Sequence, residues 1–142
     1  MKRLHVSLGA TDLDRSVAFY SELFAAAPTV LKDDYAKWQL DDPRVNFSLT
    51  ARGGAAGFDH LGIEAEDAGE LGQVIERLDA AEGPVLGRGE AACCYARSDK
   101  AWIRDPDGVA WEAFHTTARS DSFGASPNLA APQEAKACCA ND

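Results

Sequence analysis

The chain of 142 residues has the length of one domain with a sizeable core, since 46% of its residues are hydrophobic and 26% are charged. Its 14 basic and 23 acidic residues give a formal net charge of −9, which argues against DNA, RNA or an anionic membrane surface as a partner. The longest apolar stretches fall short of the ~18 residues of a membrane span, and the first residues turn polar too soon for a signal peptide, so we expect a cytoplasmic protein.

The first part of the chain predicts a module of one strand, one helix and three further strands, which we call module one (residues 1–52). Its helix follows Asp12, a residue type that caps helix N-termini, and carries an apolar stripe that includes Leu13, Val17 and Tyr20. In chain order the pattern predicts a strand at 3–9, a helix at 12–25 and strands at 28–33, 35–40 and 44–50.

A weak internal repeat predicts a second module of the same kind, module two (residues 57–117). The segment from His5 to Asp12 resembles the segment from His60 to Asp67, with the same spacing and a glycine-rich linker between the modules. In chain order the pattern predicts a strand at 58–65, a helix at 67–81 and strands at 84–89, 91–104 (with a break allowed) and 109–115.

Two βαβββ modules in one chain predict an α+β fold in which an open, barrel-like sheet surrounds a metal cleft. The domain is expected to span residues 1–117. Residues 118–142 contain few large apolar residues and are expected to form a flexible tail.

Three residues form a candidate metal site. His5 and His60 lie at matched positions of the repeat, on the strand face opposite the apolar residues, and a duplicated fold brings such positions together. Glu112 stands in an otherwise apolar strand, where a buried carboxylate is costly unless it is paired or binds a metal. Two histidines and one carboxylate form a facial triad, which suits Fe(II) and leaves coordination positions open.

Structural roles are the alternative for each of these residues. A single histidine in a strand is more often structural, although two at matched positions reverse that preference, and Glu112 could face solvent on an edge strand. Residues 46–48 of module one offer no carboxylate or histidine, which counts against a site with four ligands. His115, three residues past Glu112, faces the other side and is interpreted as structural.

The four cysteines form two adjacent pairs, Cys93–Cys94 in module two and Cys138–Cys139 in the tail. We expect reduced thiols, because neighbouring cysteines rarely bridge each other and the cytoplasm is reducing. Two adjacent thiols suit a thiophilic ion or redox exchange. The alternative for the first pair is that strand alternation buries one cysteine and exposes the other.

With these residues in place, the chain resembles the vicinal oxygen chelate superfamily, also called glyoxalase/bleomycin-resistance/dioxygenase, over about residues 3–115. The segment CCYARSDKAW, from Cys93 to Trp102, is similar to the thiol loop and D-K-x-W motif of organoarsenical C–As lyases and of cadmium-induced proteins. The sequence DSFG at 121–124 and the terminal cysteine pair are similar to the same group.

The resemblance implies an enzyme that uses dioxygen to cleave the C–As bond of trivalent organoarsenicals, methyl or aromatic, and releases arsenite. Fe(II) is the implied metal, and Ni, Co or Zn is expected to occupy its site in vitro. The implied partner is a small molecule, with no nucleic acid or membrane, and the chain is expected to be a monomer or a homodimer. The implied roles are metal ligation by His5, His60 and Glu112 and arsenic binding by Cys93 and Cys94. Because thiolate is the arsenic ligand, a nearby cation helps, and Lys100 is the local candidate, with a solvated lysine as the alternative. The adjacent thiols of Cys138 and Cys139 are expected to be accessory thiols that capture arsenic.

Two other functions stay open at this point. The first is a non-catalytic protein that binds cadmium or arsenite for resistance, and the second is a glyoxalase-type isomerase or thiol transferase. The absent fourth ligand and the cysteine pair count against the second. Trp38, Tyr95 and Trp102 are candidates to line an apolar pocket, although core packing is the favoured interpretation of each.

Overall fold

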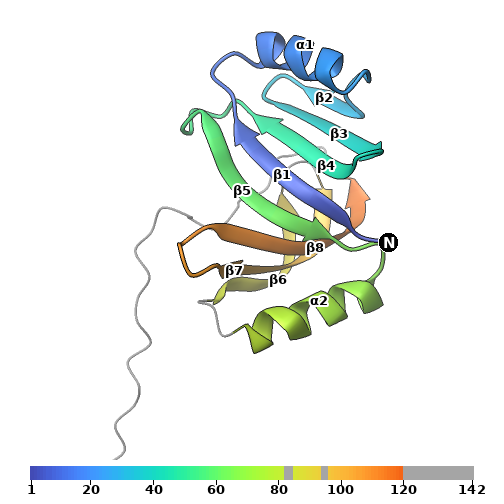
Figure 1. Ribbon diagram of the computed structural model, residues 1–142, viewed down its shortest axis with the longest axis vertical. Coiled ribbons are helices and arrows are strands. Elements are labelled where there is room, and N and C mark those ends of the chain that lie inside the picture. The colour runs from blue at the N-terminus through green and yellow to red at the C-terminus, as the bar shows by residue number, and fades with distance from the viewer. Residues whose placement is uncertain (82–84, 94–95, 120–142) are drawn as a thin grey trace, which may run out of the picture.

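The computed structural model describes residues 1–81, 85–93 and 96–119, and the side chains of 1–81 and 99–117. Within these ranges the chain forms one sheet of eight strands with two helices (Figure 1). Module one contains β1 (Arg3–Gly9), α1 (Leu13–Leu23), β2 (Val30–Lys32), β3 (Tyr35–Asp41) and β4 (Arg44–Thr50). Module two contains β5 (Gly57–Glu64), α2 (Ala68–Ala80), β6 (Val85–Cys93), β7 (Ala96–Arg104) and β8 (Ala110–Arg119).

The strand order is symmetric about the junction of the two modules. The sheet runs β2-β3-β4-β1 and then β5-β8-β7-β6, so the first strands of the two modules pair in the middle. This central pair is antiparallel, whereas β1 with β4 and β5 with β8 are parallel. Among the described strands, the outermost β2 and β6 do not pair with each other, which confirms the predicted open sheet.

Both helices begin where the sequence predicts. Asp12 accepts a hydrogen bond from the Arg15 backbone N–H at 3.0 Å, and Asp67 accepts one from the Glu70 backbone N–H at 2.8 Å. Each carboxylate thereby satisfies a free N–H group of the first helical turn. Figure 1 shows the two helices on the outside of the sheet, α1 over module one and α2 over module two.

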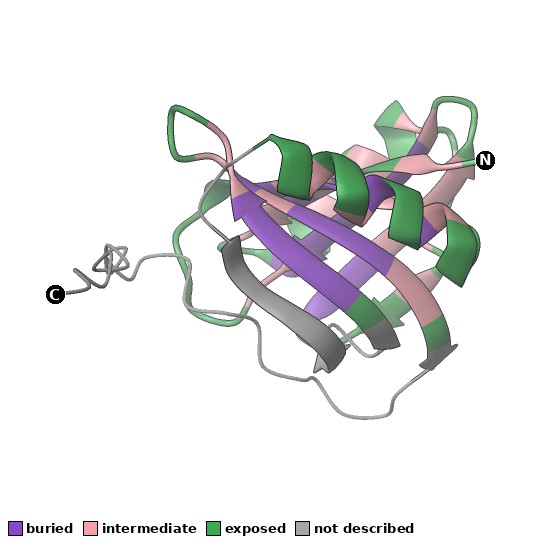
Figure 2. Ribbon diagram, turned by 90° about the horizontal axis from the view of Figure 1, so that it is seen from below, coloured by how far each residue is buried: buried purple, intermediate pink, exposed green. Residues whose placement is uncertain are grey.

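Each helix covers the apolar face of its own module. The core of module one includes Leu13, Trp38 and Phe47, and Trp38 is fully buried with its indole N–H donated to the Ala26 carbonyl at 2.9 Å. Among the side chains that the structure describes, the core of module two is aliphatic and includes Ala65, Leu71, Val74 and Ala113. Figure 2 shows buried residues along the middle of the strands and exposed residues on the outward face of a helix.

The opposite face of the sheet holds polar side chains that are nevertheless buried. Val6 and Leu8 pack toward α1, so the alternate residues of β1 point away from the helix. On β1, His5 is only 6% exposed whereas Leu4 is 44% exposed. The curved sheet therefore encloses its polar face, whose buried polar members are His5, Ser7, Asn46, Ser48, His60, Lys100 and Glu112.

The element boundaries differ from the prediction mainly in module two. The stretch predicted as a strand at 91–104 is divided, because β6 ends at Cys93 and β7 begins at Ala96. The last strand continues to Arg119, past the expected end of the domain at residue 117, because β8 pairs with β7 up to the match of Ala96 with Arg119.

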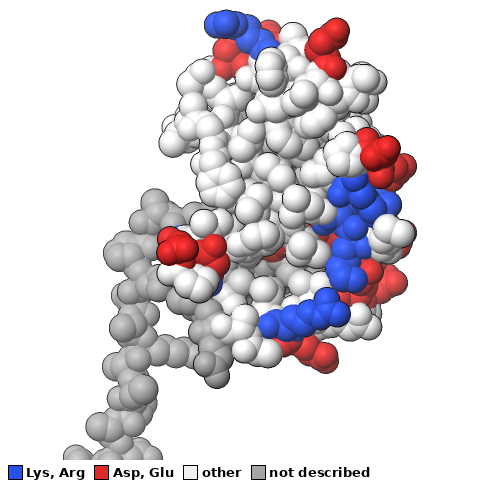
Figure 3. Space-filling model, viewed as in Figure 1, with Lys and Arg blue, Asp and Glu red and all other residues white. Residues whose placement is uncertain are grey.

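Charged side chains gather on the side of the molecule where the N-terminus lies. Basic and acidic groups are interleaved there in Figure 3. Near the N-terminus of the chain, Arg3 forms an ion pair with Asp41 at 2.5 Å, and Lys2 forms one with Glu70 at 2.9 Å. Ion pairs at the surface of a protein contribute little stability. In the described part of the chain, no helix combines the length and the apolar character needed to cross a membrane.

Candidate metal centre

The three predicted metal ligands lie together on the enclosed face of the sheet. His5 comes from β1, His60 from β5 and Glu112 from β8, which are three neighbouring strands. The Nε2 atoms of the two histidines are 3.2 Å apart. Glu112 Oε2 lies 3.7 Å from His5 Nε2 and 3.3 Å from His60 Nε2.

Strand register explains how these side chains meet. In the central antiparallel pair, His5 is opposite Gly62 and Ser7 is opposite His60, and Gly62 is in turn opposite Glu112 on β8. Gly62 therefore stands between His5 and Glu112. A Cβ atom there would lie 2.6 Å from the Glu112 carbonyl oxygen and 3.3 Å from His5 Cβ, so only glycine leaves room for the cluster.

Burial and hydrogen bonding set the charges of the cluster. Burial lowers the pKa of His5, and the negative charge of Glu112 opposes this only in part. Burial also disfavours the charged form of His60, but hydrogen bonds to Asp59 and Glu112 outweigh it and raise its pKa to about 9. For Glu112 burial acts upward, yet the His60 hydrogen bond and the Lys100 charge lower its pKa to about 2, so the carboxylate is ionised at neutral pH.

Lys100 is part of this cluster. The residue is 8% exposed, and its ammonium donates a hydrogen bond to Glu112 Oε1 and lies 5.4 Å from the centre of the Phe114 ring. The sequence predicted a role for Lys100 beside the thiols of module two. Along β7, Lys100 lies four positions after Ala96, the residue opposite Cys93, and its role beside the thiols stays a prediction. Among the described residues, the candidate ligand Glu112 is one partner of Lys100.

The donor set fits a divalent metal ion. Metal–ligand distances of about 2.0–2.2 Å place two ligands about 2.8–3.6 Å apart at octahedral or tetrahedral angles. The separations of 3.2, 3.3 and 3.7 Å are close to this range, and all three ligand atoms lie within 4.8 Å of one another. The Nδ1 atom of each histidine faces a protein acceptor, so Nε2 is the nitrogen that would bind a metal ion.

Module one offers no fourth ligand at the position that corresponds to Glu112. Ser7 corresponds to Gly62 in the repeat, and Ser7 is opposite Ser48 just as Gly62 is opposite Glu112. Ser48 therefore takes the place of a second carboxylate, and it is only 2% exposed. This agrees with the absence of an acid or histidine in residues 46–48.

Of the four cysteines, the described residues include the backbone of Cys93. Cys93 ends β6, with its backbone opposite Ala96. Its side chain lies outside the described part, as do the whole of Cys94, Tyr95, Cys138 and Cys139. Arsenic binding at the first pair and an accessory role for the second stay predictions.

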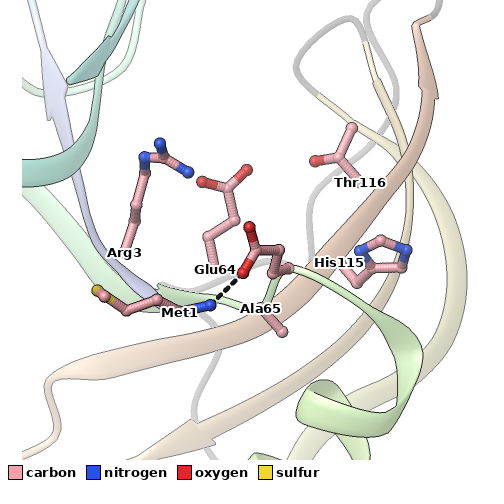
Figure 4. Close-up of a pocket in the computed structure, with 7 residues that line it drawn as sticks. Met1, Arg3, Glu64, Ala65, His115 and Thr116 are labelled. Carbon is pink, nitrogen blue, oxygen red and sulfur yellow. Dashed lines mark hydrogen bonds and ion pairs between the residues drawn. The ribbon is translucent and has the colours of Figure 1, made fainter. Parts of the chain in front are cut away.

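The remaining candidates of the sequence are placed clearly. Trp38 belongs to the core of module one, whereas the Trp102 ring packs against His60 with centroids 4.8 Å apart. His115 lines a separate cavity of about 160 Å³ with Arg3, Glu64 and Thr116 (Figure 4). Its placement away from the cluster supports a structural role.

Two features of the site escaped the sequence reasoning. One is the ion pair of Lys100 with Glu112, and the other is Asp59, whose carboxylate lies 2.7 Å from His60 Nδ1. Lys100 is 12 positions from Glu112 in the sequence, so only the register of β7 and β8 brings them together. Asp59 directly precedes His60, where strand alternation places it on the opposite face.

Fold and site together define a class: paired βαβββ modules with a buried His-His-Glu cluster at their junction. The model of the Glyoxalase/Bleomycin resistance protein/Dioxygenase superfamily matches residues 2–113, and the chain belongs to this superfamily.

Relatives and solved structures add detail to this assignment. The chain is 39% identical to the "Trivalent organoarsenical cleaving enzyme" of Bacillus sp. (strain MD1), over 100% of this chain and 85% of the relative. It is 34% identical to the "Cadmium-induced protein CadI" of Mycobacterium bovis, over 98% of this chain and 93% of the relative. The Mn(II)-bound glyoxalase from Novosphingobium aromaticivorans shares the fold, with a TM-score of 0.59 at 19% identity over 86% of this chain and 43% of that chain.

Proposed function

We propose that this protein is an Fe(II)-dependent dioxygenase that cleaves the carbon–arsenic bond of trivalent organoarsenicals and releases arsenite for detoxification. The proposal rests on one observation: His5, His60 and Glu112 converge on the enclosed face, with Ser48 in place of a fourth ligand. Two histidines and one carboxylate are typical of non-heme Fe(II) oxygenases, which keep coordination positions open. The relatives named for organoarsenical cleavage supply the substrate class.

In this proposal His5, His60 and Glu112 hold the metal ion, and Fe(II) when bound supplies the one-electron and dioxygen chemistry that protein side chains lack. Lys100 holds Glu112 Oε1 and leaves Oε2 directed at the two histidines. Trp102 and Phe114 pack beside the imidazole rings and exclude water from this face.

The two thiols of Cys93 and Cys94 would bind the substrate. A methylarsenical, CH3As(OH)2, would exchange its two hydroxyl groups for the two thiols, whose protons leave with the hydroxyl groups as two water molecules. The overall reaction balances as CH3As(OH)2 + O2 → HCHO + As(OH)3. The methyl carbon is oxidised, dioxygen accepts the electrons, and arsenic remains trivalent. The two groups of ligands have separate roles in this proposal: the soft sulfur ligands hold arsenic, and the nitrogen and oxygen ligands hold iron.

The other two functions are weaker on specific grounds. A glyoxalase-type site with four protein ligands would need an acid where Ser48 stands. A non-catalytic cadmium or arsenite protein is consistent with the CadI relatives, but thiol capture alone gives no reason for a buried His-His-Glu cluster.

The test is reconstitution of the full chain with Fe(II) under anaerobic conditions, followed by methylarsonous acid and then air. We expect arsenite, formaldehyde and oxygen uptake in equal amounts, and none of them without oxygen or metal. Arsenic binding without oxygen uptake would contradict the proposal and favour the non-catalytic protein.

Variants of the cysteines test the separation of roles. Cys93→Ser and Cys94→Ser should abolish turnover and leave Fe(II) stoichiometry unchanged, because the thiols hold substrate and the triad holds metal. The matched control is Cys138→Ser with Cys139→Ser, which should affect only KM, because a pair in the tail captures substrate without taking part in the reaction. Loss of iron in Cys94→Ser would instead make the cysteines metal ligands.

A further inference from the structure

The two histidines of the candidate metal centre are held by different acceptors. His5 Nδ1 lies 3.0 Å from the carbonyl oxygen of Asn46 and 3.2 Å from its side-chain Oδ1, both of them neutral groups. His60 Nδ1 instead lies 2.7 Å from Oδ2 of Asp59, a carboxylate. A charged acceptor makes a shorter and stronger hydrogen bond than a neutral one. The centre is therefore asymmetric beyond its ligands.

A β-bulge brings Asp59 to this position. In the pairing of β1 with β5, Ser7 is opposite His60 and Leu8 is opposite Phe58, so Asp59 has no opposing residue in β1. Regular alternation would point Asp59 away from His60. A bulge inserts one residue into a strand and redirects its side chain, which is how the carboxylate reaches the ring of the next residue.

Asp59 is much more exposed to solvent than the histidine that it contacts. The His60 side chain is 7% exposed, whereas the Asp59 side chain is 44% exposed. Asp59 also lines a cavity of about 310 Å³ together with Thr50, Arg52 and Phe58. The Asp59 carboxylate therefore keeps contact with water while it accepts a hydrogen bond from a buried ring. It can therefore act on the metal centre at little cost in desolvation.

We propose that Asp59 is the positioning residue of the metal centre. It keeps the His60 proton on Nδ1, fixes the ring orientation so that Nε2 points toward Glu112, and increases the donor strength of His60 relative to His5. Carboxylate–histidine–metal arrangements do this in known metal sites, where loss of the outer carboxylate weakens metal binding about 10–100-fold. The inference rests on the proposed metal site.

The test compares Asp59→Ala, Asp59→Asn and Asn46→Ala in the full chain. Binding of Co(II) is measured by calorimetry, and the d–d absorption of bound Co(II) reports the strength of the ligands. We expect Asp59→Ala to weaken binding about 10–100-fold and to shift the absorption bands. Asp59→Asn, which keeps an acceptor but no charge, should lie between wild type and Asp59→Ala. Asn46→Ala should have a smaller effect, because the backbone carbonyl still accepts from His5.

The melting temperature of each metal-free variant distinguishes a loss of His60 positioning from a loss of fold stability. If Asp59→Ala bound Co(II) within ~3-fold of wild type with unchanged absorption, Asp59 would be an ordinary bulge residue and the inference would be wrong. If the wild-type protein bound no Co(II), both the proposed metal centre and the inference on Asp59 would be wrong. These two results are distinguishable, because the first requires a wild-type protein that binds the metal.

Discussion

Module one and module two match strand for strand, yet they contribute unequally to the metal centre. Each supplies one histidine from the equivalent position of its first strand, His5 and His60. Only module two supplies a carboxylate, because Glu112 corresponds to Ser48. The symmetric fold thus provides the two histidine ligands. The third ligand, Glu112, is present in module two only, and the side of the centre formed by module one has Ser48 in place of a carboxylate.

The support around the ligands differs in the same way. Asn46 holds His5 in module one, and its counterpart two residues before Glu112 is Ala110, which has no polar side chain. Module two replaces that contact with the bulged Asp59. A duplicated scaffold therefore keeps its strand order while outer contacts change, which is where a superfamily can vary its chemistry.

The largest expected effect follows from removing the acid that distinguishes the modules. Glu112→Gln should weaken divalent-metal binding by more than ~100-fold, since loss of an outer contact alone costs about 10–100-fold. Calorimetry with Co(II) measures this, and Glu66→Gln, at an exposed acid, is the matched control. Metal affinity unchanged in Glu112→Gln would remove Glu112 from the site.

Stability has to be separated from ligation in that variant. Glu112→Gln removes the carboxylate that accepts a hydrogen bond from the buried Lys100 ammonium, and loss of one partner of a buried pair costs about 3–5 kcal/mol. The double variant Glu112→Gln/Lys100→Met removes the buried ammonium as well. It should regain stability without regaining metal binding.

A second prediction concerns the glycine that module two has where module one has Ser7. Gly62→Ala would place Cβ 2.6 Å from the Glu112 carbonyl oxygen, so β5 and β8 must shift. We expect a loss of about 1–3 kcal/mol in the free energy of unfolding and weaker metal binding, because overpacking displaces backbone and side chains.

The control for this change is Gly72→Ala. Gly72 lies within α2, and a Cβ there meets no atom within 4 Å. Alanine is a better helix former than glycine, so this variant should gain about 0.5–1 kcal/mol. Thermal unfolding of both variants gives the comparison, and equal stability of the two would show that the space beside Gly62 is larger than the structure indicates.

The sequence predicted what depends on local patterns. Asp12 and Asp67 mark the helix starts because capping is a local interaction, and the matched histidines follow from a repeat that is readable along the chain. The pairing of modules then brings His5 and His60 together because the central strands are antiparallel.

What the sequence could not predict depends on register between distant strands. The bulge at Asp59 is defined only against β1, and the contact of Lys100 with Glu112 only by the pairing of β7 with β8. Nor could alternation alone indicate that the polar face of β1 would be the more buried one, since this requires the curvature of the whole sheet.

The smallest expected change in metal affinity comes from a variant that makes module one resemble module two at the position of the missing ligand. Ser48→Glu adds a second carboxylate at the place that corresponds to Glu112. Without metal, two neighbouring carboxylates repel each other, so the melting temperature of the metal-free protein should fall. With metal, a fourth protein ligand should increase Co(II) or Zn(II) affinity about tenfold and suppress turnover, because it fills a coordination position that the reaction needs open.

Ser48→Ala is the control and should leave affinity within ~3-fold. Since Ser48 is 2% exposed, Ser48→Asp provides a shorter acid if glutamate does not fit. If both acids weakened metal binding as much as Glu112→Gln does, Ser48 would not face the centre, and the correspondence between the two modules would end at the histidines.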